Sequence, residues 1–203
     1  MSVAYTVNVP QLEMQTSLKL YETNGKFDDV FERVLKENPE MRVEQTATGE
    51  ILIMPGTGGL TGNRNFKLTA RFGRWLDESG DGFGFDSSTI FVLPNGAKRS
   101  PDLSWIASER WNALNAEQQA KYPPICPDFV VELRSRTDSL DELRDKMTEY
   151  IENGAKLGWL IDPKEKNVHV YRPNAVTEIL DKPDEMNGET LLPKLILNLR
   201  DFW

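Results

Sequence analysis

The sequence predicts an α/β protein in which a central mixed β-sheet is flanked by helices. Short alternating runs of apolar and polar residues, typical of strands, recur along the chain between turn residues. Two longer segments carry apolar residues at helical spacing. The chain has 203 residues, 39% of them hydrophobic and 28% charged, which is typical of a globular protein with a sizeable core.

The N-terminal part is predicted to hold an arm, a helix and a hairpin. Residues 1–26 have weak periodicity and are expected to be an arm or edge segment, followed by one domain over residues 27–203. Apolar residues at helical spacing predict a helix over 27–37, which ends at Asn38-Pro39. Turn residues at 46–49 lie between two alternating segments and predict the hairpin.

A glycine-rich segment from Pro55 to Gly62 precedes a predicted helix from Asn63 to Asp77. Its spacing fits neither a phosphate loop, because Asn63 stands where a lysine would follow Gly62, nor a dinucleotide fingerprint. We therefore expect no nucleotide cofactor. The helix also carries a basic stripe, which is either a solvated face or a contact for nucleic-acid phosphates. The stripe consists of Arg64, Lys67, Arg71 and Arg74.

The middle of the chain predicts a meander of strands, which makes the sheet mixed. The first three of these strands are predicted over 83–85, 89–93 and 99–107. Ser108 and Asn115 are expected to cap two short helices. Pro123-Pro124 then leads into a further strand that ends at Arg134.

The clearest helix of the chain begins after Ser139, which can form a capping box with Glu142. It carries apolar residues on one side and ends at Asn153-Gly154. Two strands and an apolar C-terminal segment are predicted after it, over 157–161, 168–171 and 191–203.

Two predicted strands each carry one carboxylate among apolar residues, at Asp102 and at Glu132. Burying a carboxylate without a partner costs about 2–7 kcal/mol or more, so both side chains need an explanation. Neighbouring strands lie about 4.8 Å apart, and two carboxylates in register can therefore reach one ion. Asp102 and Glu132 are candidate ligands of one Mg²⁺ or Mn²⁺ ion. The alternatives are a turn or cap role for Asp102 and an ion pair of Glu132 with Arg134 or another basic group.

Two cations are predicted near this pair. Arg134 lies two residues after Glu132 on the same strand face, and Lys146 lies at the edge of the apolar side of the capped helix. A lysine in that place can reach into a cleft, orient an attacking water and stabilise the charge of a pentacovalent phosphorus. The alternative is an exposed lysine that pairs with Glu142 or Glu149.

Composition argues against several other classes. The net charge of −8 argues against a generally basic surface for nucleic acid. Cys126, the only cysteine, is expected to be buried, and a chain with neither a disulfide nor a signal peptide is expected in the cytoplasm. The only histidine, His169, is expected to face solvent from a strand. No apolar run approaches the roughly 18–20 residues of a membrane span, so we expect a soluble protein.

Four motifs between residues 99 and 173 occur together. They are Arg99-Ser100-Pro101-Asp102, Pro127-Asp128-Phe129-Val130-Val131-Glu132-Leu133-Arg134-Ser135, Lys146-Met147-x-x-Tyr150, and Leu157-Gly158-Trp159-Leu160-Ile161-Asp162-Pro163. Together they resemble the large bacterial Uma family of restriction endonucleases, which is placed in the PD-(D/E)XK nuclease superfamily. The resemblance covers about residues 28–203.

The resemblance implies a restriction-endonuclease-like core and metal-dependent hydrolysis of phosphodiester bonds. Asp102 matches the PD half-motif, and Glu132 matches the acidic residue of the second half-motif. Arg134 stands where a lysine is usual, and an arginine is a poor proton acceptor. The resemblance therefore assigns the lysine role to Lys146, on the helix.

The superfamily also has an acidic residue on its first core helix. In this chain the helix from Asn63 has acids only at Asp77 and Glu78, so Glu44 or Glu50 is the candidate for this role.

The sequence is therefore compatible with two functions. The first is a Mg²⁺- or Mn²⁺-dependent DNA endonuclease, in which a two-fold dimer would cut both strands of a duplex. Its catalytic residues would be Asp102, Glu132, Lys146 and Arg134. The second is a nuclease-fold module with weak or no catalysis that binds nucleic acid or a protein.

Overall fold

The computed structural model describes residues 16–18, 27–39, 41–54 and 56–203. Its helices are α1 (Phe27–Glu37), α2 (Gly59–Ser79), α3 (Ser108–Asn112), α4 (Ala116–Ala120) and α5 (Leu140–Glu152), with a 3₁₀ helix η1 (Arg200–Phe202). Its strands are β1 (Thr16–Leu18), β2 (Arg42–Gln45), β3 (Ile51–Met54), β4 (Phe83–Asp86), β5 (Phe91–Val92), β6 (Lys98–Arg99), β7 (Leu103–Ile106), β8 (Phe129–Leu133), β9 (Leu157–Asp162), β10 (Asn167–Tyr171), β11 (Glu178–Asp181), β12 (Glu185–Asn187) and β13 (Ile196–Asn198).

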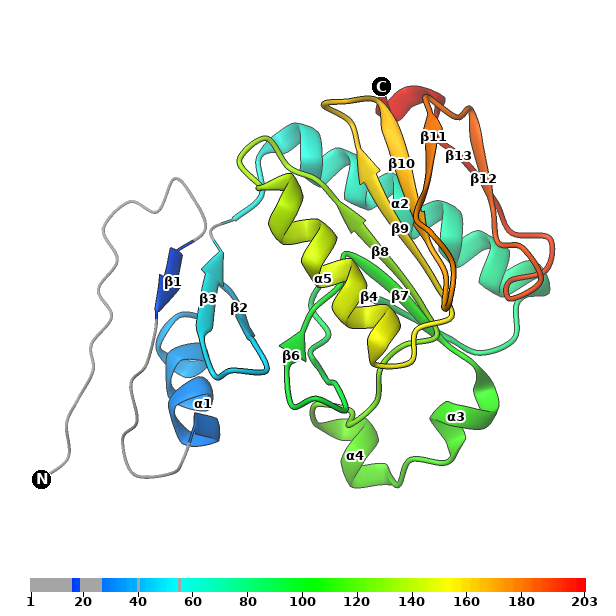
Figure 1. Ribbon diagram of the computed structural model, residues 1–203. Coiled ribbons are helices and arrows are strands. Elements are labelled where there is room, and N and C mark those ends of the chain that lie inside the picture. Colours follow the sequence, from blue (N-terminus) through cyan, green and yellow to red (C-terminus); the bar gives the residue numbers. More distant parts are fainter. Residues whose placement is uncertain (1–15, 19–26, 40, 55) are drawn as a thin grey trace, which may run out of the picture.

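The described strands form two larger sheets and one separate pair. The first sheet has the order β1-β3-β2-β6-β5 and the second the order β11-β10-β9-β8-β7-β4, while β12 pairs with β13. The second sheet is mixed, because β8 and β9 run parallel and the other neighbours run antiparallel. The predicted mixed sheet flanked by helices is confirmed (Figure 1).

Helices cover both faces of the second sheet. The apolar side of α2 buries Leu68 and Phe72 against one face, together with Phe129 of β8. The other face is covered by α5, where Met147 packs with Val130 of β8. In Figure 1, α5 lies in front of this sheet and α2 behind it. Because side chains alternate along a strand, Glu132 shares the α5 face with Val130.

The first sheet has its own small core and is joined to the second sheet by short connections, from β4 to β5 and from β6 to β7. Phe31 and Val34 of α1 pack on Ile51 and Ile53 of the hairpin formed by β2 and β3, which confirms the predicted helix and hairpin. Residues 100–102 then carry the chain from β6 of the first sheet into β7 of the second.

The connection corrects the prediction of one continuous strand over 99–107. The strand is interrupted at Ser100-Pro101-Asp102, because Pro101 has no backbone N–H to donate to a neighbouring strand. Asp102 therefore lies immediately before β7 rather than within it.

Other boundaries also differ from the prediction. Helix α2 begins at Gly59, four residues before the predicted start, so part of the glycine-rich segment is helical. Ser108 is the first residue of α3 and not its cap, whereas Asn115 forms the predicted capping box with Gln118. His169 is 2% exposed and faces the protein interior, so the prediction that it faces solvent was wrong.

The predicted segment over residues 1–26 lies mostly outside the described residues. Its one described part, β1, pairs antiparallel with β3 at the edge of the first sheet. None of the described helices has the length and apolar character needed to cross a bilayer.

Two glycines with positive φ provide a test of the packing around β7. Gly82 (φ 109°) has no space for a Cβ, which would lie 2.5 Å from the Ile106 oxygen and from the Trp105 ring nitrogen. Gly96 (φ 88°) has open space around the same position. Gly96→Ala should lower the free energy of unfolding by the strain of a left-handed residue alone, about 1–2 kcal/mol.

Gly82→Ala should cost that strain plus about 1–3 kcal/mol of overpacking. Urea denaturation of both variants measures the difference. Equal losses of stability in the two would contradict the close packing of Gly82 on β7.

Candidate active site

The two predicted carboxylates line one cleft. It has a volume of about 1090 Å³ and lies between the first sheet, the start of α2, the loop after β8 and the exposed side of α5. Asp102, Glu132 and Lys146 all line it, together with Glu44. The cleft therefore brings residues from both sheets and from α5 to one place.

Strand pairing sets Asp102 and Glu132 opposite each other. Leu103 of β7 pairs with Val131 of antiparallel β8, and one further step of this register aligns Asp102 with Glu132. The Leu133 N–H donates to Asp102 Oδ2 at 2.8 Å, which ties the connection to the end of β8. The two carboxylates therefore lie opposite each other, although Asp102 precedes β7 and is not part of the strand as predicted.

Glu132 is 3% exposed and binds two donors on α5. The Tyr150 hydroxyl donates to its Oε1 at 3.1 Å, and the Lys146 ammonium lies 2.8 Å from the same oxygen. Burial raises the pKa of Glu132, Lys146 opposes the rise, and the charges of Asp102 and Glu44 add to it, which leaves the pKa at about 7.

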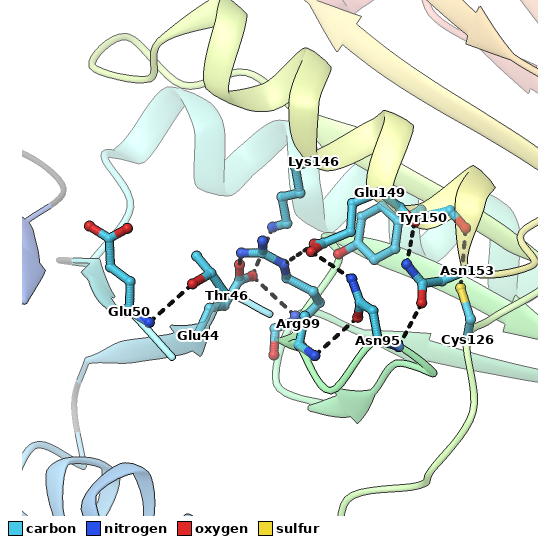
Figure 2. Close-up of polar contacts among 12 residues, drawn as sticks. Glu44, Thr46, Glu50, Asn95, Arg99, Cys126, Lys146, Glu149, Tyr150 and Asn153 are labelled. Carbon is cyan, nitrogen blue, oxygen red and sulfur yellow. Dashed lines mark hydrogen bonds and ion pairs between the residues drawn. The ribbon is translucent and has the colours of Figure 1, made fainter. Parts of the chain in front are cut away.

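Glu44 of β2 is the second carboxylate that binds Lys146 (Figure 2). It is 1% exposed, and its Oε1 accepts from the Lys146 ammonium at 2.8 Å and from the Ser100 N–H at 3.1 Å. Its Oε2 accepts from Arg99 at 3.2 Å. Burial alone would raise the pKa of Glu44, but Lys146, Arg99 and Arg42 outweigh burial and lower it to about 2.

Lys146 is held between these two carboxylates. Burial acts to lower the pKa of its ammonium, but the attraction of Glu132 and Glu44 outweighs burial and raises the pKa. Lys146 is therefore a permanent cation in the cleft, and the alternative of an exposed lysine paired only along its own helix is excluded.

A further set of contacts fixes Arg99, as Figure 2 shows. Its Nε donates to Glu149 of α5 at 2.5 Å, and the Asn95 side chain donates to the same carboxylate at 3.0 Å. The Asn95 N–H donates to Asn153, at the end of α5, at 2.8 Å. These bonds fasten the turn between β5 and β6 to α5 and so fix the position of Arg99 against Glu44.

Asp102 has two side-chain donors of its own. Arg42 of β2 donates from Nη1 to Asp102 Oδ1 at 3.0 Å, and Asn65 of α2 donates to the same oxygen at 3.3 Å. Arg42 also donates from Nη2 to the Ser100 carbonyl at 2.5 Å. Each of the two predicted metal ligands is thus already paired with one cation, Asp102 with Arg42 and Glu132 with Lys146.

The comparison with protein families matches these motifs. The model of the Uma2 family, described as "Putative restriction endonuclease", matches residues 28–200. The chain belongs to the Uma2 family.

The fold is also found among solved structures. The crystal structure of a "putative nuclease belonging to DUF820" from Anabaena variabilis ATCC 29413 has a TM-score of 0.69 and 23% sequence identity, over 79% of this chain and 88% of that chain. A search of curated proteins found no match. The solved structure confirms the fold expected from the Uma resemblance.

In this Uma2 protein, Arg134 is directed away from the cleft. Its guanidinium lies 2.6 Å from the buried carboxylate of Asp162 on β9, and its Nε donates to the Asp138 carbonyl. Arg134 does not line the cleft, although it follows Glu132 by two residues. Its ion pair with Asp162 instead links the ends of the neighbouring strands β8 and β9.

The basic stripe of α2 also lies outside the cleft. Lys67 and Arg71 both pair with Asp201 at the C-terminus, and Arg71 also donates to the Asn198 carbonyl. None of the four stripe residues, which are Arg64, Lys67, Arg71 and Arg74, lines the cleft. The possible phosphate contact on this helix gains no support.

The residues of the cleft fit a small divalent cation. In the described part of the chain, no group of three or more histidine, cysteine or acidic side chains is arranged to hold a metal. Asp102 and Glu132 provide two carboxylates, and Mg²⁺ commonly binds one or two carboxylates plus waters and substrate phosphate. Burial is the main cause of the raised pKa of Glu132, and the charges of Asp102 and Glu44 add to it; a cation bound between Asp102 and Glu132 would offset that repulsion.

Sequence reasoning missed most of the cations that surround the carboxylates. Arg42 was not singled out, although it precedes Glu44 by two residues and therefore shares its strand face. That period-two spacing of an arginine and a glutamate on one strand of the hairpin is the signal that could have identified both. Glu44, proposed only as a substitute acidic residue, is a central residue of the cleft.

The pKa of Glu132 predicts how stability varies with pH. A carboxyl group whose pKa is higher in the folded than in the unfolded protein contributes less to stability as pH rises between those two values, here from about 4.5 to about 7. Glu132→Gln removes this titration. The stability of the wild type relative to the variant should therefore fall across this window, measured by urea denaturation at each pH.

Glu44→Gln is the matched control. The pKa of Glu44 is lowered to about 2, so its contribution is lost only as pH falls from about 4.5 towards 2. If the stability difference between wild type and Glu132→Gln does not change from pH 4.5 to 7, Glu132 does not have the raised pKa.

Proposed function

We propose that this Uma2 protein is a metal-dependent endonuclease that hydrolyses phosphodiester bonds of DNA. The observation that carries the proposal is the pairing of Asp102 opposite Glu132 at the cleft, with the Lys146 ammonium 2.8 Å from Glu132. Family membership supports the same reaction class.

In the proposed reaction, a water oxygen forms a bond to phosphorus while the bond from phosphorus to one ester oxygen breaks. The leaving oxygen gains a proton, and the attacking water loses one to solvent. Lys146 stays protonated, so its role is to orient the water and to stabilise the negative charge on the pentacovalent phosphorus. Asp102 and Glu132 would hold Mg²⁺ or Mn²⁺, which supplies Lewis acidity when bound.

The charge of the cleft supports metal dependence. Among the described residues that line it, acidic side chains outnumber basic ones by eight to four. The acidic ones are Glu44, Glu50, Asp102, Glu132, Asp138, Glu142, Asp145 and Glu149, and the basic ones are Arg42, Arg99, Arg136 and Lys146. Such a cleft repels a phosphodiester until a divalent cation offsets part of the negative charge.

Two further expectations belong to this proposal. Cutting both strands of a duplex is simplest for a two-fold dimer, because each copy then meets one strand. The single cysteine, Cys126, fits a cytoplasmic location, where thiols stay reduced.

One observation favours a second function, a nuclease-fold module without catalysis. Arg42 and Lys146 already neutralise Asp102 and Glu132, so the folded chain needs no metal to bury these carboxylates. In that case the cleft would bind nucleic acid or a protein and cleave nothing.

Metal binding separates the two functions. Isothermal titration with Mn²⁺ should show binding to the wild type, and the isosteric variants Asp102→Asn and Glu132→Gln should lose it because each removes one anionic ligand. Incubation with supercoiled plasmid and Mn²⁺ should give nicks with the wild type only. A wild type that binds no Mn²⁺ and leaves the plasmid intact would favour the second function.

Variants of Lys146 and Arg134 test which of these two cations stabilises the transition state. Lys146→Met should reduce nicking by about 100- to 1,000-fold, the typical effect of removing one stabilising group. Arg134→Lys, which places a lysine at the usual motif position, should leave nicking unchanged because this side chain faces Asp162. Plasmid assays of both variants check this, and loss of nicking in Arg134→Lys alone would reverse the assignment.

A further inference from the structure

Arg42 lines the cleft, and its ion pair with Asp102 does not use all of its hydrogen-bond donors. Its guanidinium contacts Asp102 through Nη1 and the Ser100 carbonyl through Nη2, and its side chain is 28% exposed. It lines the cleft and lies among the charges of Asp102, Glu44 and Glu132. A ligand that enters the cleft can therefore reach it.

One donor of Arg42 is unused. Its Nε–H is buried, and no atom of the described residues accepts from it. Buried N–H groups without a partner are uncommon in folded proteins, and each needs an explanation such as a ligand that supplies the missing acceptor. A phosphodiester offers non-bridging oxygens, which a planar guanidinium binds well.

The other buried cations of the cleft are more fully engaged. Arg99 uses Nε on Glu149 and Nη1 on Glu44, and the Lys146 ammonium is shared by Glu44 and Glu132. Among the residues that the structure describes, Arg42 makes one ion pair, with a carboxylate that is itself a proposed metal ligand. If a divalent metal ion bound Asp102, the Arg42 guanidinium would remain beside the cleft without a carboxylate partner.

We propose that Arg42 is a catalytic residue that binds a non-bridging oxygen of the phosphodiester, and that Asp102 holds it in the cleft until the substrate enters. This inference rests on the nuclease function proposed above. The negative charge of the non-bridging oxygens must be offset in the transition state, and a preorganised arginine does this without moving far.

The inference also concerns the metal. Arg42 and a divalent cation would both be attracted to the Asp102 carboxylate, so removing the arginine would remove a competitor. A purely structural arginine would be needed to shape the metal site, and its loss would weaken metal binding. Cleavage and metal affinity should therefore change in opposite directions, which separates the two roles.

The test uses Arg42→Gln and Arg42→Lys in the full chain, with Arg110→Gln as the control. Arg110 has a similar exposure and pairs with buried Asp128, but it does not line the cleft. We expect Arg42→Gln to reduce nicking of plasmid about 100-fold or more while Mn²⁺ binds as tightly as to the wild type, or more tightly. Arg42→Lys should retain part of the nicking that Arg42→Gln loses. Arg110→Gln should nick plasmid like the wild type.

Circular dichroism melts identify any variant that fails to fold. If Arg42→Gln does not fold but Arg42→Lys does, the nicking of Arg42→Lys relative to the wild type tests the inference. Nicking by folded Arg42→Gln within a few-fold of wild type overturns the inference, as does full nicking by Arg42→Lys if only that variant folds. Joint loss of nicking and Mn²⁺ binding also overturns it, because the arginine would then shape the metal site.

Fluorescence anisotropy with a labelled duplex and Ca²⁺ distinguishes this inference from the proposed function. A wild type that binds the duplex but never nicks it refutes the nuclease, and weaker binding by Arg42→Gln would still support the phosphate contact. A wild type that neither nicks nor binds DNA refutes both.

Discussion

The arrangement of the cleft depends on the Lys146 ammonium, which Glu44 and Glu132 share at 2.8 Å each. Removing one partner of a buried ion pair typically costs about 3–5 kcal/mol, because the other charge is left without compensation. Glu44 belongs to the first sheet, Glu132 to the second, and Lys146 to α5. One ammonium group therefore holds three parts of the fold together at the cleft.

The two glutamates that share Lys146 differ in charge environment. Glu44 has three cations nearby and a pKa of about 2, whereas Glu132 lies beside Asp102 and has a pKa of about 7. Both carboxylates are buried, so the difference comes from their neighbours: Lys146, Arg99 and Arg42 lower the pKa of Glu44, whereas the charges of Asp102 and Glu44 add to the effect of burial on Glu132.

Local patterns predicted the fold and part of the cleft. Alternation placed Glu132 and Arg134 on one strand face, and helical spacing placed Lys146 at the edge of the apolar side of its helix. These results follow because side-chain direction depends on only a few neighbouring residues.

Long-range contacts were beyond such patterns. Arg42 and Arg99 reach the carboxylates from the first sheet, and nothing in a strand's own sequence states which other sheet it meets. The wrong prediction for His169 has the same origin. Periodicity identifies the two faces of a strand, but it does not tell which of them other elements cover. The sequence of β8 likewise did not reveal that Arg134 would pair with Asp162 of the neighbouring strand β9.

The connection from β6 to β7 also limits how the chain can vary in length. Arg99 is fixed by Glu44 and Glu149 at one end, and Asp102 is fixed by the Leu133 N–H at the other, with only Ser100 and Pro101 between them. Adding or removing one residue here would turn Asp102 towards the opposite face of β7, into the apolar layer beneath α2. Natural insertions and deletions in relatives of this protein should therefore avoid these four positions and accumulate in the turns at the far ends of the sheets.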